Sequence, residues 1–250
     1  MGVNTAAGEW VRVLRPEPAP HRRLVCFPPG GGSAPYYRTL SARLGPGAEV
    51  SAVQYPGRQD RLGAPLVTDL HELADHIAAA LLAQPGPARV LFGHSMGATV
   101  AYETALRLDA AGQPPHALIV SGRPAPAYEE TGTLHRADDA VLIDDLERLA
   151  TDPASVAVLR AEPGLAELVL PALRADYQAV ETYRQRPAPA LRCPVLALIS
   201  TADPTTTVAQ AQQWAQVTDG DFTLRTFPGG HFYLDDQPGA VAEAITPHLS

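Results

Sequence analysis

The segment FGHSMGA, from Phe92 to Ala98, limits the possible folds of this chain more than any other stretch. It contains the pattern G-x-S-x-G, which is typical of a sharp turn that leads from a strand into a helix and exposes a serine at the end of a sheet. An apolar run over 89–95 predicts the strand, and residues 96–112 predict the helix. Glycine on both sides of the serine relieves the crowding of a strained turn. The context therefore favours an exposed nucleophile at Ser95 over an incidental serine in a tight glycine turn.

Strand-like and helix-like segments alternate along most of the chain. Strands are predicted at 24–28, 50–56, 89–95, 117–122, 194–200 and 222–227, and helices at 69–83, 96–112, about 207–217 and about 238–249. Strands that alternate with helices form a mainly parallel sheet, because each helix carries the chain back to the start of the next strand. The sequence thus predicts an α/β fold with a mainly parallel central sheet and helices on both faces.

Residues 123–186 interrupt this alternation. The stretch has no strand signal, but it has helical patches such as AVLIDDLERLA and LAELVLPALRADYQAVETY. We interpret it as a helical lid insertion over the sheet, in which Pro171 is expected to kink or split the last long helix. With 250 residues, the chain has the size of one domain, so residues 1–250 are predicted to form a single domain that includes this lid.

A serine hydroxyl needs a base to become a nucleophile, and His231 is the best candidate among the eight histidines. It lies in FPGGHFYL, on a glycine-rich loop after the last predicted strand, where this type of fold places its catalytic histidine. His94, beside the serine, is predicted to be a packing residue instead. The histidine in turn needs a carboxylate that holds its tautomer.

Asp203 is the preferred candidate for that carboxylate. It follows the predicted strand 194–200, and the chain order Ser95, Asp203, His231 is that of the α/β-hydrolase fold. The strand at 117–122 offers the other place where such an acid is found, but no carboxylate follows it before Glu129. The sequence therefore predicts a serine–histidine–aspartate triad.

Hydrolysis by a serine nucleophile also needs donors for the oxyanion. One donor is predicted to be the backbone N–H of Met96, which follows the nucleophile, and the other should lie in the glycine-rich segment 27–34, FPPGGGSA. Such a segment could also bind phosphate, but it lacks the lysine of a P-loop. The oxyanion interpretation is therefore preferred.

Composition excludes several other classes. A net charge of −8 argues against a nucleic-acid-binding protein, which needs a basic face. The longest apolar stretch, IAAALLA, is too short to cross a bilayer, and the N-terminal segment shows no secretory leader, so a cytoplasmic protein is expected. Cys26 and Cys193 are expected to be reduced core thiols, although a disulfide between them stays open.

Taken together, these features resemble the type II thioesterases of polyketide and nonribosomal peptide assembly lines. The segments that carry the resemblance are FPPGGGSA, YPGRQDR (55–61), FGHSMGA, SGRPAP (121–126), LPALRADYQAVETY (170–183), ADP and PGGHFYL. Generic esterases share the serine turn but lack YPGRQDR and LRADY. The chain departs from the family pattern at Pro29 and Gly30, where relatives usually have His or Tyr followed by Ala.

The resemblance implies an α/β-hydrolase with Ser95, Asp203 and His231 as the triad and with the backbones of Gly30 and Met96 as the oxyanion hole. It implies hydrolysis of acyl groups from the phosphopantetheine thiol of acyl or peptidyl carrier proteins, with no metal ion and no cofactor of its own. The substitution of Gly30 leaves a backbone donor in place.

Carrier proteins are typically acidic, so we expect a local basic or apolar patch to dock them. Arg58 and Arg61 are candidates, and solvated surface charges are the alternative interpretation. Competing functions are an acyl-CoA thioesterase, a small-molecule carboxylesterase, an acyl-transferring or cyclising enzyme, and a binding protein that has the fold without the activity.

Overall fold

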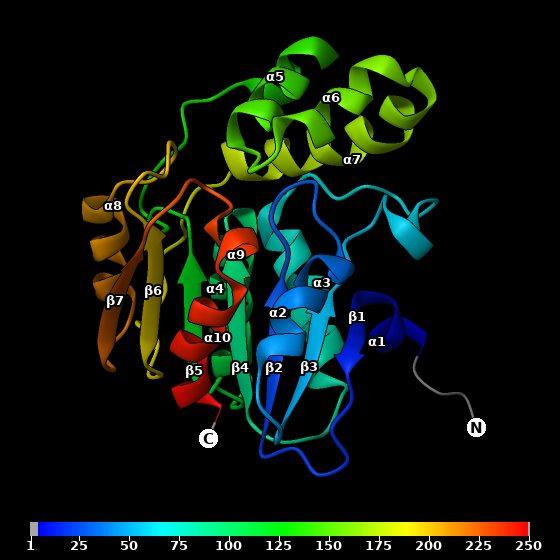
Figure 1. Ribbon diagram of the computed structural model, residues 1–250. Coiled ribbons are helices and arrows are strands. Elements are labelled where there is room, and N and C mark those ends of the chain that lie inside the picture. The colour runs from blue at the N-terminus through cyan, green and yellow to red at the C-terminus, as the bar shows by residue number, and fades with distance from the viewer. Residues whose placement is uncertain (1–4, 250) are drawn as a thin grey trace.

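The computed structural model describes residues 5–249 and contains a seven-stranded sheet in the order β1-β3-β2-β4-β5-β6-β7 (Figure 1). All neighbouring strands are parallel except β1, which pairs antiparallel with β3. The strands are β1 (Val11–Arg15), β2 (Arg22–Phe27), β3 (Ala48–Val53), β4 (Arg89–His94), β5 (Ala117–Ser121), β6 (Val195–Ser200) and β7 (Phe222–Phe227). The predicted fold class, a mainly parallel α/β-hydrolase sheet, is confirmed.

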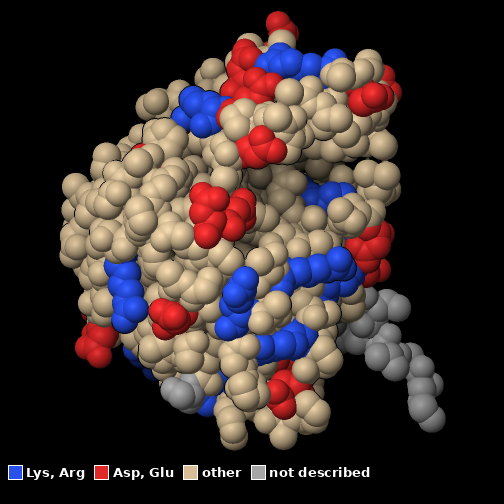
Figure 2. All heavy atoms as spheres, in the orientation of Figure 1, with Lys and Arg blue, Asp and Glu red and all other residues tan. Residues whose placement is uncertain are grey.

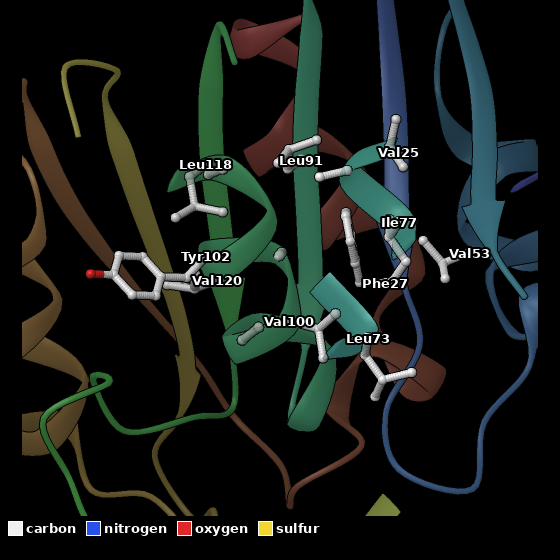
Figure 3. Close-up of a cluster of buried hydrophobic side chains, with 14 of the residues drawn as sticks. Val25, Phe27, Val53, Leu73, Ile77, Leu91, Val100, Tyr102, Leu118 and Val120 are labelled. Atoms are coloured by element: carbon white, nitrogen blue, oxygen red, sulfur yellow. The ribbon is translucent and has the colours of Figure 1, made fainter. Parts of the chain in front are cut away.

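Helices cover both faces of the sheet because successive side chains of a strand point to opposite sides. On β2, Val25 and Phe27 pack with α3 (Leu70–Leu82) and α4 (Met96–Ala110), as Figure 3 shows for part of this cluster. Leu24 and Cys26 face the other way, toward α2 (Arg38–Arg43) and α10 (Pro238–Ile245), which lie in front of the sheet in Figure 1. The central strands are therefore buried on both sides.

Local signals set the ends of the helices on either side of the serine turn. The side chain of Asp69 accepts a hydrogen bond of 2.9 Å from the backbone of Glu72, and α3 begins there as expected. α4 starts at Met96 and ends just before Gly112, whose φ of +75° is the left-handed conformation that closes many helices.

Three helices lie within the predicted lid insertion: α5 (Asp139–Leu149), α6 (Pro153–Ala161) and α7 (Pro163–Glu181). Figure 1 shows them above the ends of the strands where β4 leads into α4. They share a small apolar cluster that includes Leu142, Leu170 and Leu173. Of the two expected effects of Pro171, the split is wrong, since α7 is one continuous helix, and the kink stays a prediction. Pro171 is exposed, so water can satisfy the carbonyl that loses its partner.

The remaining elements are short. They are α1 (Thr5–Trp10), α8 (Val208–Gln212), α9 (Tyr233–Asp236) and the 3₁₀ turns η1 (Ala34–Tyr37), η2 (Gln59–Arg61), η3 (Leu134–Arg136), η4 (Gln213–Val217) and η5 (Thr246–His248). The sequence did not predict β1 or α2. No helix in the part of the chain described here is long and apolar enough to span a membrane. From the sequence, no secretory leader is expected in the N-terminal segment. Residues 1–4 of that segment lie outside the described residues.

The two cysteines are both buried free thiols, as expected for core residues. They pack on opposite faces of the sheet, Cys26 with the α2 and α10 side and Cys193 with the α3 and α4 side. Burial raises the pKa of the Cys193 thiol to about 11. At neutral pH this thiol is protonated, and it packs as a small apolar side chain.

Candidate active site

Ser95 occupies the predicted turn between β4 and α4. Its φ of 55° and ψ of −125° lie outside the conformations that ordinary residues adopt, so the turn is strained. A Cβ atom at Gly93 would lie 2.1 Å from the carbonyl oxygen of Gly97, and one at Gly97 would lie 2.0 Å from that of Phe27. The turn therefore needs glycine at both positions, as the sequence predicted.

Asp203 and His231 lie on the loops that follow two neighbouring parallel strands, β6 and β7, at the same end of the sheet. His231 Nδ1 lies 2.9 Å from Asp203 Oδ2, and both side chains are almost fully buried. With Nδ1 held by the carboxylate, Nε2 is the nitrogen left to accept a proton. This hydrogen bond joins two residues that are 28 positions apart in the sequence.

Thr205 forms the other hydrogen bonds to the Asp203 carboxylate, and it was not among the predicted site residues. Its backbone N–H and its hydroxyl donate to Asp203 Oδ1 at 2.8 and 2.7 Å. The hydroxyl also lies 3.2 Å from His231 Nδ1. The spacing of Asp203 and Thr205, with Pro204 between them, is typical of a turn in which an aspartate bonds the backbone two residues later. That signal was available in the sequence.

The environment keeps Asp203 ionised. Burial alone would raise its pKa, but the hydrogen bond and charge of His231, together with the bonds from Thr205, outweigh burial and lower the pKa. An ionised carboxylate stabilises the protonated imidazole that forms when His231 takes a proton.

A cavity of about 280 Å³ lies between these residues and the lid helices, and both Ser95 and His231 line it. Ser95 is half-buried, in contrast to the fully buried residues on either side of it. Among the described residues, no hydrogen bond joins the Ser95 hydroxyl to the His231 ring, a gap that often closes only when substrate binds. Two of the three predicted triad residues, Ser95 and His231, thus line one cavity, and the third, Asp203, is hydrogen-bonded to His231.

The two predicted oxyanion donors, Gly30 and Met96, line the same cavity. As the first residue of α4, Met96 has no partner within the helix for its N–H. Within residues 5–249, the N–H groups of Gly30 and Met96 donate no backbone hydrogen bond outside the helices and strands. Both N–H groups are therefore free to bind a negative oxygen near Ser95.

The lid side of the cavity carries several polar side chains. The hydroxyl of Tyr177 donates to Asp145, and Arg148 pairs with the same carboxylate at 2.6 Å. Arg123 pairs with Glu130 at 2.7 Å on another part of the wall. A second, more apolar cavity of about 490 Å³ shares Gly30, Leu146, Leu173 and Phe232 with the first. Figure 2 shows a hollow beneath the lid helices with acidic side chains beside it.

His94 is fully buried beneath the site and acts as a packing residue, as expected. Its Nδ1 lies 2.9 Å from the hydroxyl of Ser121, which lies 2.7 Å from the hydroxyl of Tyr233. Its ring packs against the ring of His231, with 4.9 Å between centroids. Burial and the neighbouring His231 lower the pKa of His94 well below its ordinary value, although Asp203 opposes the shift. His94 is therefore neutral at physiological pH.

The structure corrects the expectation that Arg58 is a surface contact for a carrier protein. Its side chain is only 9% exposed, and its guanidinium forms two hydrogen bonds to Asp176. Burial would lower the pKa of Arg58, but Asp176 raises it, so the guanidinium is charged. Arg61 is half-buried, with its guanidinium 4.0 Å above the ring of Trp10 and a 2.9 Å bond to the Gln54 carbonyl. Its docking role stays a prediction.

Relatives of this chain were found by sequence. Residues 22–249 match a family described as a thioesterase domain. The chain is 44% identical over 243 residues to a probable cadicidin biosynthesis thioesterase of Streptomyces griseus, which covers 97% of this chain and 66% of that protein. It is 42% identical over 250 residues to thioesterase PikA5 of Streptomyces venezuelae, over 99% of this chain and 88% of the relative. The chain thus spans just under two thirds of the first relative's length.

Solved structures agree with these relatives. The type II thioesterase BorB from the borrelidin biosynthetic cluster superposes with a TM-score of 0.88 at 43% identity, over 96% of this chain and 98% of BorB. YbtT, a type II thioesterase from the yersiniabactin pathway, gives 0.86 at 32% identity, over 96% and 98%. The resemblance to type II thioesterases is thereby confirmed. This chain belongs to the thioesterase domain family, whose members hydrolyse thioesters and share its α/β-hydrolase fold.

Proposed function

We propose that this enzyme hydrolyses acyl thioesters carried on the phosphopantetheine arm of acyl or peptidyl carrier proteins, in a polyketide or nonribosomal peptide pathway. YbtT is a type II thioesterase of such a pathway, which supports the proposal, and we expect the enzyme to work in the cytoplasm. We infer that residues 1–250 work as one domain in which residues 123–186 form a lid over the site. The carriers are its protein partners, and the proposed chemistry needs no cofactor.

In the proposed reaction Ser95 is the nucleophile, His231 the general base and Asp203 the residue that orients His231. The Ser95 hydroxyl attacks the thioester carbonyl while His231 takes its proton. The tetrahedral oxyanion accepts hydrogen bonds from the N–H groups of Gly30 and Met96, each of which contributes about 3–4 kcal/mol to lowering the barrier.

Collapse of this intermediate breaks the C–S bond. The pantetheine thiolate leaves with the proton held by His231, and a thiol with a pKa of about 8.5 is a good leaving group. The acyl group is then an ester on Ser95. Water attacks it with His231 again as base, which releases the carboxylic acid and restores the hydroxyl.

One observation carries this proposal. The imidazole of His231 is bonded to a buried carboxylate at 2.9 Å, and it shares a cavity with a serine on a strained strand-to-helix turn. A turn of this kind stores strain that a merely structural serine would not need. The identities of 44% and 42% to two thioesterases support the thioester substrate.

The test compares three substrates that carry the same acyl group: an acyl carrier protein, a free acyl-pantetheine thioester and an oxygen ester. We expect the carrier thioester to have the highest kcat/KM, and we expect Ser95→Ala to abolish its turnover. Equal turnover of the free pantetheine thioester would indicate a small-molecule thioesterase such as an acyl-CoA thioesterase, and preference for the oxygen ester would indicate a carboxylesterase. A native protein whose Ser95 resists a fluorophosphonate probe would support a binding protein without activity.

A further inference from the structure

One buried ion pair joins two segments that distinguish this chain from generic esterases. The segments are YPGRQDR (55–61) and LPALRADYQAVETY (170–183). Arg58 Nη1 lies 2.6 Å from Asp176 Oδ2, and Nη2 lies 2.8 Å from Oδ1, so the contact is bidentate. The two residues are 118 positions apart, and their side chains are 9% and 3% exposed. The proposed reaction gives this pair no role.

The pair also holds the glycine loop, which we define as residues 29–32. The backbone N–H of Gly31 donates to Asp176 Oδ2 at 2.7 Å, and Arg58 Nη1 donates to the carbonyl of Gly32 at 3.1 Å. One donor and one acceptor of the loop backbone are thus fixed by side chains from two distant segments. Gly30, which lines the cavity, is the residue directly before these contacts.

The glycine loop also has a local constraint, since the Gly32 N–H donates to the Pro29 carbonyl at 2.9 Å. Gly31 has a φ of +73°, and a Cβ there would lie 3.0 Å from Leu173 of α7, so no side chain at this position could pack in place of the ion pair. The segment that presents Arg58 is itself constrained, because Gln59 has a φ of +52°, which is uncommon for a residue other than glycine. The ion pair therefore ties a local turn to two segments that are distant in the sequence.

We propose that Arg58 and Asp176 are positioning residues that fix the glycine loop so that the Gly30 N–H faces the oxyanion, and that they hold α7 as a stationary wall of the site. The proposal rests on the proposed function in so far as Gly30 is an oxyanion donor. The competing interpretation is a structural ion pair, but a buried pair is weak evidence for stability, because the cost of removing two charges from water offsets their attraction.

The test is the hydrolysis of an acyl-pantetheine thioester, which needs no carrier docking, by Arg58→Lys and Asp176→Asn. Lysine keeps the charge but loses the planar two-pronged contact. We expect kcat per active site to fall by about 10²-fold with KM changed by less than about threefold, because a small displacement of an oxyanion donor acts on the transition state. Active sites are counted by labelling Ser95 with a fluorophosphonate.

A matched control comes from the same segment. Asp60 forms an exposed ion pair with Arg12 at 2.5 Å, and Asp60→Asn removes a carboxylate as Asp176→Asn does. We expect Asp60→Asn to keep the native kcat. Hydrogen exchange should report the same contrast: the Gly31 amide exchanges faster in Arg58→Lys and Asp176→Asn, and at the native rate in Asp60→Asn.

A second variant separates positioning from stability. Arg58→Met combined with Asp176→Leu removes both charges, and such apolar replacements of buried ion pairs often leave stability unchanged or higher. We expect this double variant to fold with a native melting temperature and to show the same loss of kcat. If a single variant fails to fold, this double variant still tests the proposal.

Three results decide the matter. Native kcat per labelled site in the double variant, or in Arg58→Lys, overturns the proposal. An effect in Asp176→Asn alone also overturns it, because Asp176 lines the cavity and could touch substrate directly, whereas Arg58 is not among the residues that line it. If native Ser95 takes no label, the proposed function fails independently of these variants.

Discussion

At the scale of single residues, the carboxylate of Asp203 has the clearest role. It bonds His231 on one oxygen and Thr205 on the other, so both oxygens are satisfied and the imidazole is held in one tautomer. An amide in place of the carboxylate favours the wrong tautomer and cannot stabilise the imidazolium. We therefore expect Asp203→Asn to lower kcat by about 10⁴-fold while the fold is retained.

Steady-state hydrolysis of an acyl-pantetheine thioester measures this loss. Asp221→Asn is the control, since Asp221 is exposed beside the start of β7, and it should retain native kcat. If Asp203→Asn has near-native activity, another carboxylate must serve His231, and this assignment of the triad is wrong.

Thr205 offers a milder test at the same scale. Thr205→Val removes the hydroxyl that bonds Asp203 and approaches His231, but it leaves the backbone bond of 2.8 Å in place. A hydrogen bond to a charged carboxylate contributes about 1.5–3 kcal/mol, so kcat should fall by about tenfold to 150-fold. A loss as large as that of Asp203→Asn would contradict this supporting role.

At the scale of elements, the turn between β4 and α4 depends on close contact between two backbones. The Gly97 Cα lies so near the end of β2 that an added methyl group would overlap the carbonyl of Phe27. We expect Gly97→Ala to lower the free energy of unfolding by about 3 kcal/mol, because neither backbone can move without breaking the sheet.

Gly164→Ala is the matched control, since a Cβ at Gly164, near the start of α7, meets nothing within 4 Å. It should leave stability unchanged or raise it by up to about 1 kcal/mol. Urea unfolding of both variants measures the difference. Equal stability of Gly97→Ala and the native protein would mean that the turn is looser than the contact implies.

The elements also show what the sequence could predict. Most of the six parallel strands contain apolar runs bounded by turn residues, so this pattern was sufficient to predict that they are strands. β1 was missed because it is a short edge strand in which Val13 is 55% exposed, and α2 because six residues give too little periodicity. α7 was correctly predicted to be helical, but its continuity past Pro171 depends on solvent exposure, which a sequence pattern does not reveal.

For the site, strand ends and chain order were enough to find the residues that meet around the cavity. The contact between Arg58 and Asp176 was beyond such reasoning, because it joins segments 118 residues apart through the folded lid. The need for a basic patch that docks acidic carriers suggested a surface role for Arg58, whereas in the fold its guanidinium pairs with Asp176 inside the protein.

At the scale of the whole molecule, buried His94 links stability to pH. Its pKa in the folded protein is well below the ordinary value of 6.5, chiefly because of burial. Below about pH 6.5 the unfolded chain therefore binds a proton that the folded protein refuses. The stabilisation is present above that pH and is lost as the pH falls, by up to about 1.4 kcal/mol per pH unit.

We expect His94→Gln to show a shallower decline in unfolding free energy between about pH 6.5 and about pH 5 than the native protein. His76→Gln is the control, because the side chain of His76 is 49% exposed, and it should keep the native slope. Urea unfolding at several pH values measures both. Identical slopes for His94→Gln and the native protein would show that His94 does not carry this dependence.

Mass spectrometry of the enzyme during turnover tests the central claim most directly. The protein is mixed with an acylated carrier, quenched in acid, digested and searched for the mass of the acyl group. We predict an acyl ester on Ser95 that is absent from Ser95→Ala, together with loss of hydrolysis in that variant. Continued hydrolysis of the carrier thioester by Ser95→Ala, or an acyl adduct on another residue of the native protein, would contradict the account.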